Sequence, residues 1–331
     1  MTSDAQILAA LRTAAPGAVS GAELADRLQI SRAAIWARIQ ELRRLGYDID
    51  ASPHLGYRLV SAPDLLHADD LLSQLTHPRT VGRDIRVFKQ TTSTNDIVEK
   101  LARDGVKEGV AVFAESQTKG RGRLGRPWVS PAGKGLWFSI LLRPPIRPQD
   151  TTQLTVAAAA SVSRAIRRIT GLPAAIKWPN DIWIGTRKVA GILTEMNAEL
   201  DMVRYAILGI GLSVNSTASD FPPEWRETTS SLRMEAGHSI PRATLAVALL
   251  EDLEQDYQSV RIGKFEAVAE EWQSRCLTLG RNVQIQMGSR LIKGTAESLD
   301  ATGALLLRTQ HGLLERITGG DVTMVVSPKK N

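Results

Sequence analysis

Glycine alternates with arginine in residues 115–128, which read Glu-Ser-Gln-Thr-Lys-Gly-Arg-Gly-Arg-Leu-Gly-Arg-Pro-Trp. Glycine lets the backbone come close to a ligand, and arginine is a charge-assisted hydrogen-bond donor for phosphate or carboxylate. No Gly-Lys-Ser/Thr follows, so this is not a Walker A loop. The pattern predicts an anion-binding loop that is mobile when empty. On these residues alone, a basic loop that binds nucleic acid is the alternative.

Two lysines stand in two short motifs further along the chain. Residues 176–181 read Ile-Lys-Trp-Pro-Asn-Asp, a tight bend that carries Lys177, Asn180 and Asp181. Residues 187–193 read Arg-Lys-Val-Ala-Gly-Ile-Leu and place Lys188 at the start of an apolar strand. Two lysines near one end of a sheet are suited to hold a carboxylate and an α-phosphate together. The alternative is that each is an ordinary lysine at a strand end, as single lysines usually are.

Two weaker motifs carry small residues. Residues 208–215 read Leu-Gly-Ile-Gly-Leu-Ser-Val-Asn, and glycines inside a strand indicate close approach to the backbone. Residues 93–95 read Ser-Thr-Asn and stand where a helix is expected to begin. Their polar groups either cap that helix or hydrogen-bond a polar ring.

Hydrophobic periodicity predicts a mixed central region. Helical spacing predicts helices over residues 94–105, 152–170, 244–257 and 264–275. Apolar runs predict strands over residues 110–114, 136–142, 181–184, 189–196 and 203–209. Because several strands follow one another through short turns, we expect an α+β sheet rather than a regular βαβ repeat.

The two ends of the chain differ from this centre. Near the N-terminus, Ser20 and Ser31 stand at helix-capping positions, and only a tight turn separates the two helices that they begin. That is the helix-turn-helix pattern, and a predicted hairpin around Pro53 forms a wing. From residue 277 onward, glycines separate short predicted strands at 283–287, 291–297, 304–308, 313–317 and 322–326, as in a small β-barrel. We therefore expect domains over residues 1–62, 63–276 and 277–331.

The composition narrows the class of protein. Among 331 residues there is one cysteine, and the net charge is +6. A single cysteine excludes a disulfide framework, and a mild positive charge permits an anionic partner. No signal peptide is recognisable at the N-terminus, and no apolar run approaches the roughly 20 residues of a membrane span. We expect a soluble cytoplasmic protein that does not contact a membrane.

Taken in order, these motifs resemble those of the biotin–protein ligases. The Gly-Arg-Gly-Arg and Lys-Trp-Pro-Asn-Asp elements are the specific ones, and the resemblance covers nearly the whole chain. It implies a winged helix-turn-helix domain, like that of bifunctional members that repress biotin genes. It also implies an α+β ligase domain with a class II synthetase-like mixed sheet, and an SH3-like C-terminal β-barrel. The implied reaction joins biotin and ATP, with Mg²⁺, as biotinyl-5′-AMP and then acylates a lysine of biotin carboxyl carrier protein.

The resemblance also implies residue roles, carried over motif by motif. Biotin is expected to contact Ser93, Thr94, Asn95, Gln117, Gly120, Arg121, Gly122, Arg123, Trp128, Lys188, Gly191, Gly209 and Gly211. ATP or the adenylate is expected to contact Arg121, Arg123, Arg126, Lys177, Asn180 and Asn215. The expected catalytic residues are Lys188, Lys177 and Arg123, and the expected Mg²⁺ ligand is Asp181. Ser213 is a departure, because the family often has asparagine there and serine lacks the two-sided pairing of an amide.

Binding of operator DNA is implied for the N-terminal domain, by a homodimer that forms when biotinyl-5′-AMP, the co-repressor, is bound. Ser31, Arg32 and Ala33 stand at the N-terminus of the candidate recognition helix, where major-groove contacts are made. Arg38 and Arg58 are placed to meet phosphates. A winged helix that docks a protein is the alternative for this domain.

Two other functions remain open for the whole chain. A lipoate or octanoate ligase shares the catalytic fold, but the basic loop and the terminal β-barrel favour biotin. A non-catalytic, biotin-sensing repressor would be expected to lack the lysines or the basic loop, and both are present.

Overall fold

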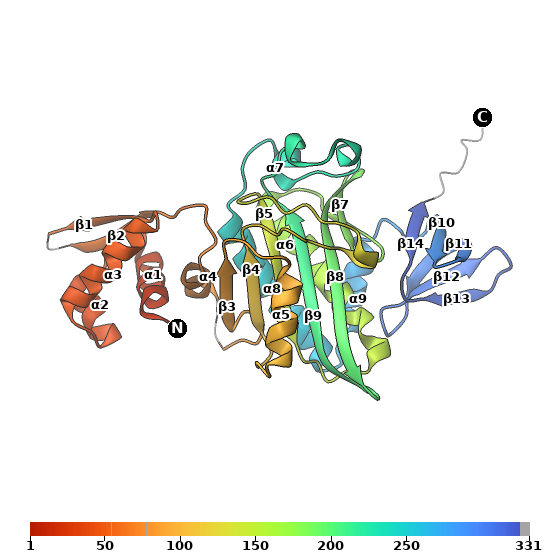
Figure 1. The fold of residues 1–331 in the computed structure, drawn as a ribbon, viewed down its shortest axis with the longest axis horizontal. Coiled ribbons are helices and arrows are strands. Elements are labelled where there is room, and N and C mark those ends of the chain that lie inside the picture. The colour runs from red at the N-terminus through yellow and green to blue at the C-terminus, as the bar shows by residue number, and fades with distance from the viewer. Residues whose placement is uncertain (54, 77, 325–331) are drawn as a thin grey trace.

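The computed structural model of the protein describes residues 1–53, 55–76 and 78–324. Figure 1 shows three parts along the longest axis: helices with a hairpin near the N-terminus, a large sheet with helices, and a small β-rich part. The fold is α+β, as the sequence predicts. Within the described residues, no helix is both long and apolar enough to span a bilayer.

The N-terminal part is a helix-turn-helix with a wing. Its elements are α1 (Ser3–Ala14), α2 (Gly21–Leu28), α3 (Arg32–Arg44), β1 (Asp48–Ser52) and β2 (Gly56–Ser61). The hydroxyl of Ser20 accepts a hydrogen bond from the amide of Glu23, and that of Ser31 accepts one from Ala34. Both predicted caps are therefore confirmed. The three helices enclose an apolar core of their own around Ile35.

A seven-stranded sheet forms the central part. In pairing order its strands are β3 (Asp84–Phe88), β4 (Val110–Ala114), β5 (Gly135–Leu142), β9 (Met202–Ser213), β8 (Arg187–Glu199), β7 (Asp181–Ile184) and β6 (Ala175–Lys177). β3 and β4 run parallel, and the other neighbours are antiparallel. β9 continues through its two glycines to residue 213, past the predicted end at 209, because β5 and β8 pair with it on both sides.

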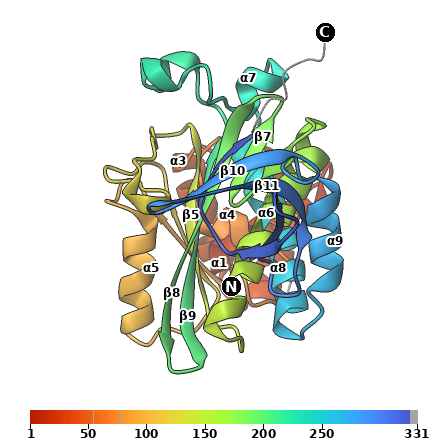
Figure 2. The same cartoon turned by 90° about the vertical axis from the view of Figure 1, so that its right-hand side faces the viewer.

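Helices cover both faces of this sheet. α5 (Thr94–Arg103) packs on β4, β5 and β9 from one side. On the other side lie α6 (Thr152–Thr170), α8 (Arg242–Arg261) and α9 (Glu266–Ser274). Figure 2 shows α5 on one side of β8 and β9, with α8 and α9 on the other.

Alternation along β9 decides which of its residues face α5. Successive side chains in a strand point to opposite faces. Leu208 and Leu212 are buried in the main core with residues of α6 and α8. Gly209, Gly211 and Ser213 alternate with these core residues. They therefore present their Cα atoms or side chains on the α5 side.

The C-terminal part is a five-stranded antiparallel sheet, and the expected β-rich, SH3-like domain is confirmed. In pairing order its strands are β13 (Leu314–Ile317), β12 (Leu305–Thr309), β11 (Arg290–Leu299), β10 (Asn282–Met287) and β14 (Asp321–Met324). Ile285 and Leu307 on its apolar face join the core of the central part. The predicted strand at 322–326 runs past residue 324 and so lies partly outside the described residues.

Several short elements were not predicted, among them β3, β6, α4 (Ala68–Gln74) and α7 (Leu232–Ala236). α4 attaches the helix-turn-helix part, because α1 packs on it. The guanidinium of Arg12 lies 2.5 Å from Oδ1 of Asp70, whose side chain is 1% exposed. In Figure 1, α1 stands between α3 and α4, so the outer side of α3 is turned away from the central part.

Candidate active site

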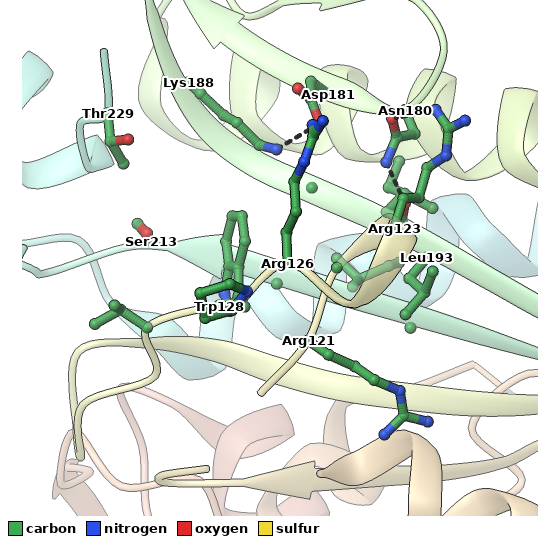
Figure 3. A pocket seen from close by; sticks show the side chains of 18 of the residues that line it. Arg121, Arg123, Arg126, Trp128, Asn180, Asp181, Lys188, Leu193, Ser213 and Thr229 are labelled. Carbon is green, nitrogen blue, oxygen red and sulfur yellow. Dashed lines mark hydrogen bonds and ion pairs between the residues drawn. The ribbon is translucent and has the colours of Figure 1, made fainter. Parts of the chain in front are cut away.

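A cavity of about 600 Å³ opens on the α5 side of the central sheet. Its walls come from the start of α5, the basic loop, strands β6 to β9, the loop that follows β9, and residues 320–323 of the C-terminal part. Figure 3 shows the basic loop with Arg123, Arg126 and Trp128 lying across the strands that carry Lys188 and Ser213. Segments separated by more than half of the chain thus meet around one space.

Backbone pairing places three of the motifs in one row across the sheet. Lys177 of β6 pairs with Asp181 of β7, and Asp181 pairs with Gly191 of β8. Gly191 in turn pairs with Gly211 of β9. Neighbouring strands lie only about 4.8 Å apart. The bend at 176–181, the strand at 187–193 and the Gly-Ile-Gly segment therefore form one continuous floor.

Uncharged polar side chains line one end of the cavity. Ser93, Thr94 and Asn95 begin α5 and are at most 4% exposed. Ser93 is the N-cap residue, yet its side chain makes no capping hydrogen bond. Helix capping therefore does not explain the serine at this position. The amide of Thr94 donates to Oε1 of Gln117 at 2.8 Å, and Nε2 of Gln117 donates to Ser130. Groups that both donate and accept are suited to a polar ring.

The opposite end carries the two lysines. Nζ of Lys188 lies 2.6 Å from Oδ1 of Asp181 and 5.2 Å from the centre of the Trp128 ring. Nζ of Lys177 lies 4.3 Å from the centre of the Trp183 ring. Burial lowers the pKa of Lys177, and the charge of Lys188 lowers it further while Asp181 opposes both. These ammonium groups can bind the anionic groups of a ligand, either beside the carboxylate of Asp181 or in its place.

Arg121 borders the polar end rather than the lysines. Its guanidinium forms ion pairs with Asp96 and Glu195, and in Figure 3 the side chain extends away from Lys188. Glu195 also accepts a hydrogen bond of 2.6 Å from Nδ2 of Asn95. The loop is therefore anchored at the polar end through charged groups on α5 and β8.

The other two arginines tie the basic loop to the opposite wall. Nη1 of Arg123 donates to Oδ1 of Asn180 at 3.3 Å and to the carbonyl of Gly320 at 3.4 Å. Arg126 forms an ion pair with Asp321. Burial lowers the pKa of Arg123. Because a guanidinium stays charged at any physiological pH, Arg123 brings a positive charge into the cavity.

Trp128 lies across the glycines of the floor. A Cβ atom at Gly211 would lie 2.5 Å from Nε1 of this indole, and one at Gly191 would lie 3.1 Å from its ring. A Cβ atom at Gly209 would lie 2.3 Å from Oδ1 of Asn95. The close approach predicted at these glycines is made by the protein's own side chains. Nε1 of Trp128 is buried and has no hydrogen-bond partner among the described residues.

Most of the predicted ligand contacts meet in this cavity. Its lining includes Ser93, Thr94, Asn95, Gln117, Arg121, Gly122, Arg123, Arg126, Trp128, Lys177, Asn180, Asp181, Lys188, Gly191, Gly209 and Gly211. Two predicted residues are not in it. The carbonyl of Gly120 accepts a hydrogen bond from the amide of Trp128, which holds the indole in place. The side-chain amide of Asn215 donates to, and accepts from, the backbone of Ile240, whereas Ser213 lines the cavity.

Two walls were missed by the sequence analysis. One comes from the loop after β9, with Phe221, Trp225, Thr228 and Thr229, and the other from the C-terminal part, with Gly320, Asp321, Val322 and Thr323. The first loop is held by a hydrogen bond from the amide of Lys188 to the carbonyl of Thr228. A pair of aromatic residues in the otherwise polar stretch 216–230 was the available signal. Nothing in residues 320–323 marks a ligand wall.

The predicted DNA contacts lie on α3 and on the wing. Arg32 and Ala33 are exposed in the first turn of α3, and the hydroxyl of Ser31 is used as its cap. Arg38 and Arg58 each have an acidic neighbour, at 3.8 and 2.6 Å. An arginine paired with an acid must exchange that partner before it can contact a phosphate.

Three family models match the chain in the order of its three parts. The HTH domain matches residues 4–58, the biotin/lipoate A/B protein ligase family matches 87–215, and the biotin protein ligase C terminal domain matches 278–325. Fold, cavity and domain order together define a protein ligase with an attached helix-turn-helix domain.

Relatives narrow this class further. The bifunctional ligase/repressor BirA of Bacillus subtilis is 38% identical over 306 residues, 92% of this chain and 94% of that protein. The bifunctional ligase/repressor BirA of Escherichia coli is 31% identical over 92% of each chain. The structure of the Aquifex aeolicus biotin protein ligase with biotin and ATP matches with a TM-score of 0.62 at 31% identity, covering 74% of this chain and 100% of that one. The chain belongs to the family of bifunctional biotin–protein ligases and repressors.

Proposed function

We propose that this protein joins biotin and ATP as biotinyl-5′-AMP and transfers the biotinyl group to a lysine of biotin carboxyl carrier protein. We also propose that it represses biotin genes, with biotinyl-5′-AMP as co-repressor. The names of its relatives and the Aquifex complex with biotin and ATP support both functions. In this proposal residues 1–62 are the DNA-binding domain, residues 63–276 the catalytic domain and residues 277–331 the C-terminal domain, of which residues 320–323 close the nucleotide side of the cavity.

The polarity of the cavity is the observation that carries the ligase function. Biotin has an uncharged ureido ring at one end and a carboxylate at the other, with an apolar chain between them. Thr94, Asn95 and Gln117 offer uncharged donors and acceptors at one end of the cavity. Lys188 offers a cation at the other end, and Trp128 lies between. The proposed pose sets the ring among the polar groups and the carboxylate on Lys188.

In the proposed first step, a carboxylate oxygen of biotin attacks the α-phosphorus of ATP, and the bond from that phosphorus to pyrophosphate breaks. Both reactants are anions, so the protein must orient them and offset their repulsion. Lys188 holds the carboxylate, while Lys177 and Arg123 stabilise charge on the α-phosphate. Arg126 and Asn180 contact the nucleotide, and Arg121 with Gly122 closes the loop over the adenylate.

The residues present fit a Mg²⁺ ion that arrives with ATP. Such an ion usually keeps several waters and takes one or two carboxylates together with substrate phosphates. Among the described residues, no group of three acidic, histidine or cysteine side chains could hold a metal by itself. Asp181 supplies one carboxylate on the cavity wall. Bound there, Mg²⁺ would neutralise phosphate charge.

In the proposed second step, an uncharged lysine amine of the carrier attacks the acyl carbon of the adenylate. The carbon–nitrogen bond forms, the carbon–oxygen bond to AMP breaks, and the nitrogen releases a proton to solvent. No nucleophile from the enzyme is needed. The basic loop must therefore retain the adenylate until the carrier arrives, and then admit the carrier's lysine.

Repression requires two copies of the chain in this proposal. Ordering of the basic loop around the adenylate builds a surface for a second copy, and the dimer presents two α3 helices to a palindromic site. Half-sites would be about one helical turn apart or a multiple of it. The ligand acts on DNA through its higher affinity for the dimer. Both functions place the protein in the cytoplasm.

One assay tests the ligase function. The protein is incubated with ATP, a carrier domain and either biotin or lipoate, and the carrier is weighed by mass spectrometry. A mass increase of one biotinyl group is expected with biotin alone. Transfer of lipoate instead would identify a lipoate ligase, and no transfer from either acid would leave a biotin-sensing repressor.

A second assay tests repression. Affinity for operator DNA is measured at fixed salt, because phosphate contacts make it strongly salt-dependent. Biotin with ATP should tighten binding, and removal of residues 1–62 should abolish it while ligation continues. Equal affinity with and without the ligand, at protein concentrations below dimerisation, would contradict the proposed coupling.

A further inference from the structure

Four large apolar side chains in the described residues of the helix-turn-helix part are exposed, Met1, Trp36, Leu55 and Val60, and of these four only Trp36 lies on α3. Trp36, on α3, is 58% exposed. The buried face of α3 is formed by Ile35, Ile39 and Leu42, each fully covered. Trp36 therefore contributes little to the packing of its own domain.

Trp36 lies in the middle of the exposed stripe of α3. Arg32 and Ala33 precede it by about one helical turn, Ala37 follows it directly, and all three are exposed. Residues three and four apart share one face of a helix. Arg32, Ala33 and Trp36 therefore point in similar directions, with Arg44 exposed near the far end of the helix.

The alanines beside Trp36 leave its indole projecting from this stripe. Alanine side chains at 33 and 37 end at Cβ, whereas the indole reaches several ångströms further. α1 packs against α4, whereas α3 packs on α1, α2 and β1 of its own part. A partner that approaches this exposed face of α3 therefore contacts Trp36 before it contacts the helix backbone.

We propose that Trp36 reads a thymine of the operator by contacting its 5-methyl group in the major groove. This inference rests on the DNA binding proposed above, and it adds the base that this residue selects. The indole has one N–H donor and no acceptor. It therefore lacks the paired hydrogen bonds that identify guanine or adenine, whereas apolar contact identifies the thymine methyl. Arg32, one turn earlier, supplies the polar contact beside it.

The experiment isolates one methyl group. Full-length protein with biotin and ATP selects its preferred duplex from a random DNA library. Each thymine of that duplex is then replaced in turn by uracil, which lacks only the 5-methyl group. Affinities are measured for the wild type and for Trp36→Ala, Trp36→Leu and Arg32→Ala, at one salt concentration and with biotin and ATP present.

For the wild type, uracil at one position in each half-site should weaken binding about fourfold, the effect of one buried methyl-sized group. Trp36→Ala should bind the thymine duplex more weakly and lose the uracil effect at that position. Trp36→Leu should keep part of that effect because leucine is apolar. Arg32→Ala should weaken binding but keep the uracil effect, since its contact is a different one.

Each contrary result has a distinct meaning. If the wild type enriches no sequence, the DNA-binding function is wrong and the inference falls with it. If a sequence is enriched but Trp36→Ala keeps every uracil effect, the inference alone is overturned, and Trp36 then contacts the DNA backbone or a second copy of the chain. Thermal unfolding of Trp36→Ala should match the wild type, because an exposed indole is not part of the core, so weaker DNA binding cannot be ascribed to unfolding.

Discussion

Nζ of Lys188 lies 2.6 Å from Oδ1 of Asp181, on neighbouring strands of the cavity floor (Figure 3). The side chains are 28% and 23% exposed, so the pair is only partly screened by water. Asp181 thus occupies the place at Lys188 that the proposed pose gives to the carboxylate of biotin. Binding of biotin would release Asp181, which is then free to approach the Mg²⁺ ion that accompanies ATP.

Replacement of Lys188 by alanine should slow adenylate formation about tenfold to a hundredfold, because a charge-assisted hydrogen bond in a partly buried site is lost. The measurement is the rate of pyrophosphate release with saturating ATP. Arg187→Ala is the matched control, since Arg187 pairs with Glu235 and does not line the cavity. Normal adenylation by Lys188→Ala would remove Lys188 from the mechanism.

Adenylate formation should decline at alkaline pH. Burial lowers the pKa of Lys177 below its ordinary value of 10.5, so this lysine loses its charge earlier than a free lysine as pH rises. The protonated form is the one that stabilises the α-phosphate. Activity should therefore be retained at neutral pH and fall as pH approaches the lowered pKa. In Lys177→Arg the fall should move to higher pH, and an unchanged pH profile would contradict this role.

Gly211→Ala should weaken the binding of biotin on the order of tenfold, because the added Cβ would force the indole of Trp128 to move. The contact is steric, so a second change can relieve it. Trp128→Phe removes the indole atoms nearest to Gly211, and the double variant should bind biotin better than Gly211→Ala alone. Titration calorimetry measures both, and equal affinities of the single and double variants would refute the steric explanation.

Arg123→Gly should release a larger share of the biotinyl-5′-AMP that it forms, and because loss of the α-phosphate contact should also slow synthesis, release is compared per pyrophosphate formed. Arg123 connects the basic loop to Asn180 and Gly320, and its loss should open that side of the cavity. Free adenylate acylates exposed lysines, so labelling of albumin with biotin reports the release. Lys119→Gly removes a charge from the same loop outside the lining and should label albumin no more than the wild type. Equal labelling by Arg123→Gly and the wild type would contradict the retention role.

Arg12→Ala should lower the free energy of unfolding by about 1–3 kcal/mol, since it leaves the carboxylate of Asp70 buried without its cation. Because this pair joins α1 to α4, operator affinity should fall as well, while adenylation should persist. Denaturant unfolding measures the first effect. Arg103→Ala removes an exposed ion pair on α5 and should leave unfolding unchanged. A stable Arg12→Ala variant would show that the interface does not depend on this pair.

Local sequence determined the elements whose signals are short-range. Ser20 and Ser31 cap helices because their hydroxyls reach backbone amides three residues away. The helix at 152–170 and the strands at 110–114 and 181–184 agree with their predicted bounds, because a long amphipathic pattern or a dense β-branched run specifies its own conformation. The motifs likewise identified most of the cavity lining, since each holds its chemistry within a few residues.

Only the tertiary structure decided which groups face one another. Asn215 stands in a motif beside the cavity, yet its amide is used by the backbone of Ile240. The wall at 320–323 carries no local signal, and the wall at 221–229 carries only a pair of aromatic residues. The partners of Arg121 and Arg126 lie far away in sequence. A side-chain partner is set by where distant segments pack to bury apolar surface. A local pattern predicts the conformation of its own segment. It does not predict which charged side chain of a distant segment will lie on the opposite wall of the cavity.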